Sequence, residues 1–336
     1  MNKIKAAVLM ATYNGEKYLR KQIDSILRQT FDNFILVIRD DGSSDETIAI
    51  IEEYCENDNR IVFLTNNSNE KGAYLNFWNL LYFARNNTIC DYYFLCDQDD
   101  IWELNKLERM IKFAVTENPI TPLLVYSDMS VINEKDEVIY DSYDMMLNNG
   151  DCHPCSTFYT RDLFWGCTMM INKSLLWNIP LFPLNDERIT IMSHDTYLAE
   201  FAALYGEVKY LKQTLTRHRK HLDNVSGNAT LLYNNRLILK KIFGSSFDKK
   251  SKIHARTYAQ SILALTEFEK AGYSSPQSER IKKSIEKGGI YGVRQLLLYR
   301  VKKRQFTRSA ILYLIMCSGL YRRYLKTYLA KEEIVQ

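Results

Sequence analysis

Residues 92–102 read YYFLCDQDDIW, an apolar run that passes directly into a cluster of carboxylates. Residues 92–96 have the length and the aromatic composition of a strand buried on both faces of a sheet. Asp97, Asp99 and Asp100 follow, and three such carboxylates repel one another unless a cation neutralises them. A turn that only caps the next helix needs one Asp, whereas a hard divalent ion such as Mg²⁺ or Mn²⁺ prefers several oxygen ligands. The stretch therefore predicts a metal site at the end of a buried strand.

Short apolar runs of the same kind recur through the first 130 residues. They are rich in β-branched and aromatic residues, and they lie at positions 4–10, 34–38, 61–64 and 123–126. Apolar residues between these runs recur at the spacing of a helix. This alternation predicts an α/β fold with a doubly wound, mostly parallel sheet. In such sheets ligands gather at the carboxyl ends of the strands, so the residues just after each strand are the candidates for a site.

The pattern changes further along the chain. Residues 138–140 and 169–171 are short apolar runs that suit antiparallel strands. A helix is expected after Ser193, a candidate N-cap, and Gly206 is expected to end it as a C-terminal cap. A strand over residues 207–211 completes the part of the chain with mixed elements.

The distribution of charge divides the chain into two parts. Residues 229–336 contain 22 Lys and Arg against 7 Asp and Glu, a balance of +15, which leaves −11 for residues 1–228. We therefore predict an α/β domain over residues 1–228 and a helical, basic region over residues 229–336. Basic residues alternate there with apolar runs, as in helices that lie on an anionic membrane surface. A helical bundle packed on the first domain is the alternative, and nucleic acid is not an expected partner because no nucleic-acid module accompanies the charge.

Composition and cysteine usage indicate a cytoplasmic protein. The seven cysteines are scattered, and several lie inside apolar runs, which suits a reducing compartment better than a disulfide framework. The apolar run at residues 6–10 is too short for the core of a signal peptide, and no stretch reaches the roughly 18 apolar residues that span a bilayer. We expect the protein in the cytoplasm, either free or peripheral on the inner face of the cell membrane.

Three other predicted strands also end in polar loops. The first loop offers Thr12 and the ring of Tyr13, on which a nucleobase could stack. Residues 40–45 read DDGSSD, a tight turn that caps the next helix and leaves Asp40 free to accept a hydrogen bond from a ligand such as a pyrimidine N3–H. Lys71 in the third loop could meet a phosphate, although alone it would pass as a surface lysine. Four such loops at equivalent strand ends predict one shared site.

In this order the loops strongly resemble those of the inverting glycosyltransferases of family 2, whose GT-A fold carries an Asp-x-Asp metal motif. The motifs are Ala11-Thr12-Tyr13-Asn14-Gly15, Asp40-Asp41-Gly42-Ser43-Ser44-Asp45, Asn69-Glu70-Lys71-Gly72 and Asp97-Gln98-Asp99-Asp100-Ile101-Trp102. The last of these looks most like the bacterial rhamnosyltransferase branch, which builds surface polysaccharide. The resemblance covers roughly residues 1–228.

The resemblance implies roles for these loops. Asp40 would read a pyrimidine base, and Asp99 and Asp100 would hold Mg²⁺ or Mn²⁺ with the diphosphate of a nucleotide-sugar donor. Asp97 would lie either behind the metal ligands or near the sugar. The implied donor is dTDP-rhamnose, with a UDP-hexose as the alternative. The implied acceptor is a saccharide of a growing surface polysaccharide, either free or linked to a lipid.

Residues 193–196 read SHDT and resemble the acidic motif of the same family. The resemblance implies that Asp195 is the general base that deprotonates the acceptor hydroxyl, although many relatives have Glu-Asp where this chain has His194-Asp195. Taken from the residues alone, Asp195 would only complement a helix N-terminus, which contributes about 0.3–1 kcal/mol.

Residues 217–227 read RHRKHLDNVSG, which predicts a flexible basic loop. It resembles the His-x-x-Asn-Val-Ser-Gly segment of the family, with His221 and Asn224 at the matching positions. Such a loop either closes over the site and supplies positive charge to the departing diphosphate, or is simply solvated. Trp165 precedes a predicted strand and lies either in an acceptor pocket or in the core.

Two other functions fit parts of this pattern. A phosphohydrolase would use Asp97 as a nucleophile, but that class places its motif after the first strand, and here the motif follows the fourth. A catalytically silent sugar-nucleotide-binding protein would keep the four loops and would not depend on Asp195.

Overall fold

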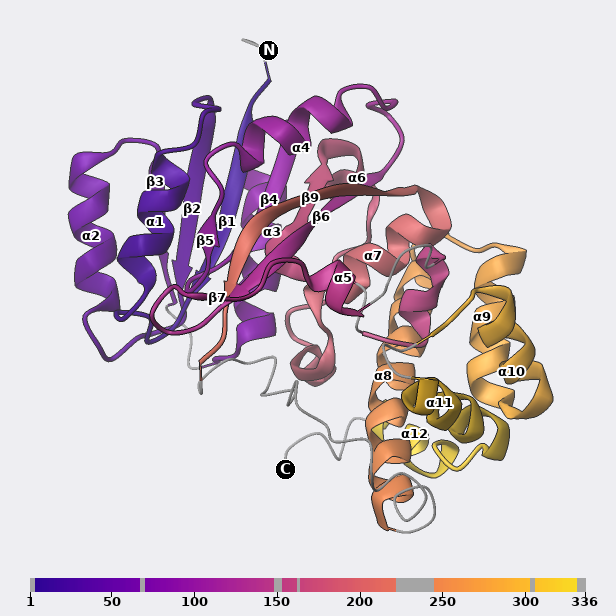
Figure 1. The fold of residues 1–336 in the computed structure, drawn as a ribbon. Coiled ribbons are helices and arrows are strands. Elements are labelled where there is room, and N and C mark those ends of the chain that lie inside the picture. Colours follow the sequence, from indigo (N-terminus) through magenta and orange to yellow (C-terminus); the bar gives the residue numbers. More distant parts are fainter. Residues whose placement is uncertain are drawn as a thin grey trace. The chain divides into compact units, whose positions relative to one another are not determined.

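The chain folds as two units, the first of which contains a large β-sheet (Figure 1). The computed structural model describes residues 4–66, 70–147, 153–161, 164–221, 245–302 and 306–330. The first unit comprises Met1–Asp144, Trp165–Leu184 and Gly206–Asn228, and the second comprises Met145–Phe164, Asn185–Tyr205 and Ala229–Gln336. The chain therefore passes between the units several times, which differs from the single boundary predicted after residue 228.

Four parallel strands form one half of the sheet, in the order β3-β2-β1-β4. These strands are β1 (Ala6–Thr12), β2 (Phe34–Asp40), β3 (Ile61–Thr65) and β4 (Tyr92–Asp97). The helices that follow them in the chain are α1 (Leu19–Leu27), α2 (Thr47–Asn57), α3 (Ala73–Asn87) and α4 (Lys106–Ala114). Each strand lies where an apolar run predicts it, so the alternation of strand and helix is confirmed.

The other half of the sheet continues from β4 in the order β8-β6-β9-β5, and β7 pairs with β6. Its strands are β5 (Ile101–Trp102), β6 (Leu123–Ile132), β7 (Val138–Tyr140), β8 (Met169–Asn172) and β9 (Glu207–Arg219), with helix α6 (Lys173–Asn178) after β8. β8 is antiparallel to both β4 and β6, whereas β6 and β9 are parallel. The antiparallel strands predicted near residues 138–140 and 169–171 are therefore present.

The apolar composition of β1 follows from its burial on both faces. Val8 and Met10 pack in one core cluster with Ile23 of α1 and Met110 of α4. Leu9 points to the opposite face, because successive side chains of a strand alternate, and it too is fully buried. An apolar residue is therefore needed at every position rather than at alternate ones.

The order of the strands places a switch point between β1 and β4. From β1 the chain proceeds outward through β2 and β3, and then returns to the other side of β1 as β4. Ala11 and Asp97 are partners in the register of these two strands, so the loops that follow them begin side by side. In open α/β sheets this crevice is where ligands bind.

Strand β9 is longer than the sequence predicts. It continues beyond Leu211 to Arg219, pairing with β6 along its length and with β5 through Arg217. His218 and Arg219 are both buried, so the first part of the predicted flexible basic loop is a strand in the sheet. The expectation of a loop from Arg217 was wrong because the sequence gives no sign that a cationic stretch is buried.

The second unit is built from helices. In chain order they are α7 (His194–Tyr205), α8 (Ser245–Lys270), α9 (Pro276–Lys287), α10 (Gly289–Leu298), α11 (Phe306–Ser318) and α12 (Arg322–Leu329); α5 (Tyr143–Leu147) lies at the first passage between the units. Aromatic rings hold α7 to α8, with Phe201 packed edge-on against Phe268 and Tyr273. Over the residues that the structure describes, no helix has the length and apolarity to span a membrane.

Helix α7 begins and ends where the sequence predicts, but the contacts at its two ends differ from the predicted caps. The hydroxyl of Ser193 donates to the carboxylate of Asp195. Gly206 has no left-handed φ, and its lack of a side chain matters because a Cβ there would lie 2.2 Å from the carbonyl oxygen of Pro122. Close approach of the backbone, and not a left-handed cap, therefore explains this glycine.

Candidate active site

The loops after β1 and β4 are joined by the side chain of Gln98. Its Oε1 accepts from the backbone N–H of Tyr13 at 2.8 Å, and its Nε2 donates to the backbone oxygen of Tyr13 at 2.9 Å. A Cβ at Gly15 would lie 2.3 Å from the same Oε1, so any larger residue there would displace the Gln98 side chain. This pairing holds the acidic turn against the first loop and leaves the ring of Tyr13 half exposed.

Asp40 organises the loop after β2. Its carboxylate accepts hydrogen bonds from the hydroxyl of Thr12 at 3.0 Å, from the backbone of Gly42 and Ser43 at 2.8 and 2.7 Å, and from the hydroxyl of Ser43 at 2.6 Å. Thr12 and Asp40 are both almost completely buried. Asp40 therefore lies at the predicted strand end, with its oxygens turned into its own loop.

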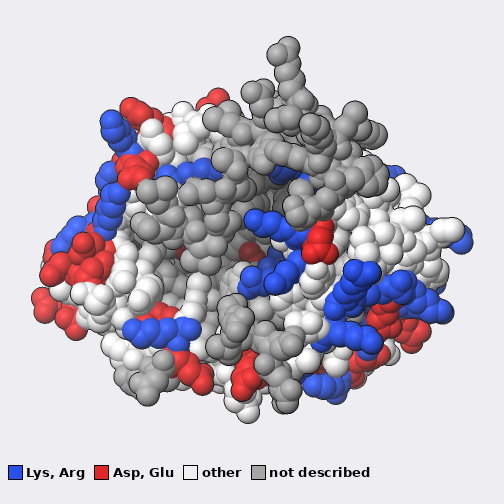
Figure 2. All heavy atoms as spheres, turned by 90° about the horizontal axis from the view of Figure 1, so that it is seen from below, with Lys and Arg blue, Asp and Glu red and all other residues white. Residues whose placement is uncertain are grey.

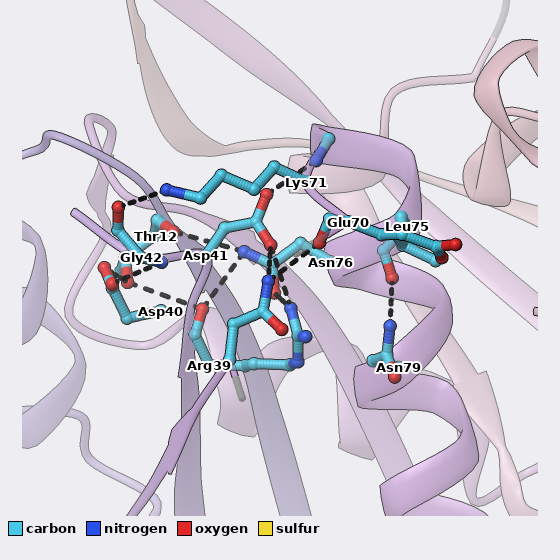
Figure 3. Close-up of polar contacts among 12 residues, drawn as sticks. Thr12, Arg39, Asp40, Asp41, Gly42, Glu70, Lys71, Leu75, Asn76 and Asn79 are labelled. Atoms are coloured by element: carbon cyan, nitrogen blue, oxygen red, sulfur yellow. Dashed lines mark hydrogen bonds and ion pairs between the residues drawn. The ribbon is translucent and has the colours of Figure 1, made fainter. Parts of the chain in front are cut away.

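A buried ion pair lies behind this loop and was not predicted (Figure 3). Arg39 donates to the carboxylate of Asp41 at 3.2 Å and to the side-chain oxygen of Asn76 at 2.9 Å. Asn76 in turn donates to the backbone oxygen of Thr12 at 3.1 Å, and Asp41 accepts from the N–H of Gly72 at 2.6 Å. The network ties the first three loops together. An arginine directly after the apolar run of residues 34–38 was the one sign of it in the sequence.

Lys71 reaches over the second loop (Figure 3). Its ammonium donates to the backbone oxygen of Gly42 at 2.8 Å and lies 5.5 Å from the centre of the Tyr13 ring. The φ of Gly42 is +81°, a left-handed value that suits glycine. The structure therefore brings Thr12, Tyr13 and Lys71 to the same edge of the sheet as the acidic turn.

Asp99 faces a histidine from the end of β9. Its Oδ2 lies 2.6 Å from Nε2 of His221, and both side chains remain partly exposed, at 13% and 10%. The His221 ring packs on Tyr18, with ring centres 5.1 Å apart. Two metal-ligating atoms are therefore held together at an accessible position. Asp97, at the end of β4, is also partly exposed.

Asp100 lies in a different environment. It is completely buried, and its Oδ1 accepts from the N–H of Arg219 at 3.0 Å and pairs with Nδ1 of His218 at 2.9 Å. Burial alone would raise the pKa of the Asp100 carboxyl, but the charge and hydrogen bond of His218 hold this pKa below its usual value. Burial likewise opposes the charge on His218, and Asp100 outweighs it and raises the pKa of the imidazole. The two groups form a buried ion pair.

Lys106 places a further positive charge behind the acidic turn. Its ammonium donates to the backbone oxygen of Cys167 at 2.6 Å and to the hydroxyl of Thr216 at 2.8 Å, and it lies 3.7 Å from the centre of the Trp102 ring. Burial lowers the pKa of Lys106 to about 8, against the opposing effect of nearby anionic groups that include Asp100. A lysine is rarely buried, so nothing in the sequence singled out Lys106.

Two sets of groups are candidates for a metal. Within the described ranges, Asp100, Cys167 and His218 have ligand atoms within 4.8 Å of one another, and all three are buried. An ion that binds a diphosphate needs positions open to phosphate oxygens, and Mg²⁺ and Mn²⁺ prefer oxygen to thiol ligands. This buried set does not fit such an ion. The pair of Asp99 and His221 offers accessible oxygen and nitrogen atoms and does fit.

The remaining predicted residues lie as follows. Trp165 is partly exposed and packs against Tyr143 and His218, with ring centres 5.4 and 6.1 Å away. Asn224 lies outside the described residues. Asp195 is partly buried at the start of α7 in the second unit, where its Oδ1 accepts from the N–H of Thr196 at 2.6 Å.

Helix α7 also carries a buried carboxyl group that was not predicted. Glu200 is completely buried and accepts from the hydroxyl of Ser261 at 2.5 Å. Burial raises the pKa of Glu200 to about 8. His194, at the start of the same helix, is also buried, which lowers its pKa to about 4 and leaves the ring neutral.

Comparison with known proteins decides the family. The model of glycosyl transferase family 2 matches residues 7–179, just over half of the chain, and this span includes all four strand-end loops. The chain belongs to glycosyl transferase family 2. Like other members it is a glycosyltransferase that uses a nucleotide-sugar donor.

Two curated relatives have assigned donors. The chain is 27% identical to the dTDP-rhamnosyl transferase RfbG of Shigella flexneri over 225 residues, which cover 65% of this chain and 73% of that protein. It is 35% identical to the UDP-Glc:α-D-GlcNAc-diphosphoundecaprenol β-1,3-glucosyltransferase WfgD of Escherichia coli over 127 residues, 38% of this chain and 46% of that protein.

Solved structures agree on the fold. TarS 1–349 of S. aureus in complex with UDP-GlcNAc matches with a TM-score of 0.55 at 15% identity, over 97% of this chain and 91% of that one. The longer TarS chain matches with a TM-score of 0.51, and this chain spans 55% of its length. The predicted GT-A fold with a helical C-terminal region is therefore confirmed.

Loss of the charge on Asp100 should destabilise the protein. Asp100→Asn removes the anion that holds the proton on the buried His218, and we expect the free energy of unfolding to fall by about 3 kcal/mol or more in urea titrations followed by circular dichroism. The double variant Asp100→Asn with His218→Gln should be more stable than Asp100→Asn alone, because it removes both charges. Equal stability of the wild type and Asp100→Asn would show that no buried pair exists.

Glu200 should make stability depend on pH. Its folded pKa of about 8 lies above its ordinary value of 4.5. The neutral carboxyl therefore stabilises the fold fully below about pH 4.5, and this contribution is lost as the pH rises to about 8. The side chain of the Glu200→Gln variant stays neutral at every pH. Between these two pH values the free energy of unfolding of the wild type should therefore fall further than that of the variant, by a difference of about 1 kcal/mol or more. Parallel pH curves for the two proteins would contradict this assignment.

Proposed function

We propose that this family 2 protein is an inverting, metal-dependent transferase that moves rhamnose from dTDP-rhamnose to a growing surface-polysaccharide acceptor. The observation that carries the proposal is the accessible pair of Asp99 and His221, which lies at the switch point of the sheet beside the loop of Tyr13. A metal-bound diphosphate and a stacked nucleobase fit these two features.

The donor is assigned from chemistry and from similarity together. The exposed ring of Tyr13 offers a surface for a base, and the loop organised by Asp40 offers hydrogen-bonding groups beside it. RfbG, whose name gives a dTDP-rhamnosyl donor, supports rhamnose at 27% identity. WfgD, whose name gives a UDP-glucose donor, makes a UDP-hexose the alternative to be tested.

We assign the metal to Asp99 and His221, and we assign a structural role to Asp100. Asp100 holds His218 and the end of β9 in place, which positions His221 opposite Asp99. Bound Mg²⁺ or Mn²⁺ would act as a Lewis acid that stabilises the negative charge of the departing nucleoside diphosphate. Lys71 lies at the same edge of the sheet and would add a positive charge close to the diphosphate.

Asp195 completes the reaction as the general base. Its carboxylate accepts the proton of an acceptor hydroxyl while the oxygen of that hydroxyl forms a bond to the anomeric carbon of the sugar. The bond from that carbon to the diphosphate oxygen breaks on the opposite face, and the bonding pair leaves with the nucleoside diphosphate. Configuration at the anomeric carbon is therefore inverted.

The acceptor is proposed to be a saccharide carried on a lipid. The name of WfgD specifies a sugar linked to diphosphoundecaprenol, which supports this class of acceptor. Such an acceptor lies in a membrane, so the protein would act in the cytoplasm, peripheral on the inner face of the cell membrane. Asn224 and Trp165 are the remaining candidates for contact with the acceptor or the diphosphate.

The donor and metal assignments can be tested together. With Mn²⁺, the wild type should release nucleoside diphosphate faster from dTDP-rhamnose than from any UDP-hexose. Asp99→Asn should lose at least about 100-fold of this activity and also the increase in melting temperature that Mn²⁺ and dTDP cause together.

The matched control is Asp32→Asn, an exposed carboxylate just before β2 at the opposite end of the strands. It should behave as the wild type does. A faster reaction with a UDP-hexose would overturn the rhamnosyl assignment, and full activity of Asp99→Asn would overturn the metal assignment.

The role of Asp195 can be separated from its place at a helix N-terminus. Asp195→Asn keeps an acceptor for the N–H of Thr196 but cannot take a proton, so kcat should fall about 10²–10⁴-fold while donor binding, measured by thermal shift, is retained. Glu187→Gln, an exposed carboxylate in the same unit, should keep full activity. Near-complete activity of Asp195→Asn would rule it out as the base.

A further inference from the structure

Helix α10 presents an apolar stripe to solvent. Ile290, Leu297 and Leu298 are 85%, 62% and 57% exposed, and Val293 is partly exposed. These positions share one face with Arg294, because residues at i, i+3, i+4, i+7 and i+8 align on a helix. The stripe extends along about 12 Å of the helix axis. The opposite face of α10 is buried in the second unit, so the stripe is not an uncovered part of its core.

Positive charges border this stripe. Residues 280–302 contain seven Lys and Arg and one acidic residue, Glu286. Lys287 and Arg300 are exposed at the two ends of α10, and Lys283 of α9 lies 5.9 Å from the centre of the Tyr291 ring. Figure 2 shows one face of the molecule, with Lys and Arg side chains in blue gathered on its right and Asp and Glu side chains in red among them.

The turn between α9 and α10 sets the direction of the stripe. Gly288 and Gly289 both have left-handed φ values, of +60° and +63°. Gly292 packs so closely that a Cβ there would lie 2.3 Å from the sulfur of Met316. The helix is therefore fixed against α11 with its apolar face outward.

We propose that this face of α10 binds an anionic lipid surface. Ile290, Leu297 and Leu298 would enter the boundary between headgroups and acyl chains, and the bordering cations would meet the lipid phosphates. A nucleic acid would satisfy the cations but would leave three large apolar side chains in water. Charge and apolar surface together therefore favour a membrane over other anionic partners.

This inference does not depend on the proposed sugar transfer. The stripe belongs to the second unit and contains none of the residues assigned to the donor, the metal or the general base. Binding to vesicles and release of nucleoside diphosphate are separate measurements, so failure of one proposal is distinguishable from failure of the other.

Co-sedimentation with vesicles tests the proposal. The full chain should bind vesicles of phosphatidylcholine mixed with phosphatidylglycerol, bind vesicles of phosphatidylcholine alone much more weakly, and dissociate as salt is raised. Leu297→Ser with Leu298→Ser should lower the partition coefficient for the mixed vesicles at least about 10-fold, because apolar contact area is lost. Release of nucleoside diphosphate in solution should be unchanged, which shows that the variant is folded.

The matched control is Ile89→Ser with Ile120→Ser, which removes two exposed side chains, 81% and 79% exposed, from the first unit. Its binding should equal that of the wild type. The proposal is overturned if the wild type does not bind the mixed vesicles at low salt, or if the α10 variant binds as well as the wild type. It is also overturned if light scattering shows a lipid-free dimer that the α10 variant abolishes, because a second copy would then cover the stripe.

Discussion

Compensation of buried charge behind the acidic turn is the constraint on which the rest of the site depends. A completely buried carboxylate such as Asp100 is stable only when a partner neutralises it, and His218 supplies that charge from β9. Arg219 adds a backbone hydrogen bond, and Lys106 adds a second buried cation. These contacts fix the end of β9, so His221 meets Asp99 at the surface of the sheet. The pair that we propose to hold the metal therefore depends on the buried pair behind it.

The same arrangement explains why Asp99 and Asp100, although adjacent in the sequence, lie in different environments. Strand β4 ends at Asp97, and the turn that follows directs Gln98 to the first loop, Asp99 to an accessible position and Asp100 into the interior. The two hydrogen bonds between the Gln98 side chain and the Tyr13 backbone hold the acidic turn against the first loop. Rigid placement of this kind allows a site to bind a charged ligand without reorganising.

Local patterns predicted the strands and the strand ends. Apolar runs such as that of β1 indicate a sheet covered on both faces, and loops at equivalent strand ends indicate where the candidate site lies. Long-range pairing was not predictable, because burial of Lys106 or of His218 depends on partners about 60–120 residues away. For the same reason Asp99 and Asp100 were predicted as equivalent metal ligands, whereas the structure places them in different environments. The passages of the chain between two units also have no local signature, so the place of Asp195 in the second unit was not foreseen.

The most direct test of this account is a crystal structure with dTDP and Mn²⁺, in which anomalous scattering locates the ion. We predict one manganese peak bound by the carboxylate of Asp99 and the imidazole of His221, with the diphosphate on the ion and the base beside Tyr13. A peak among Asp100, Cys167 and His218, or a nucleotide bound away from the ends of β1 and β4, would contradict the account.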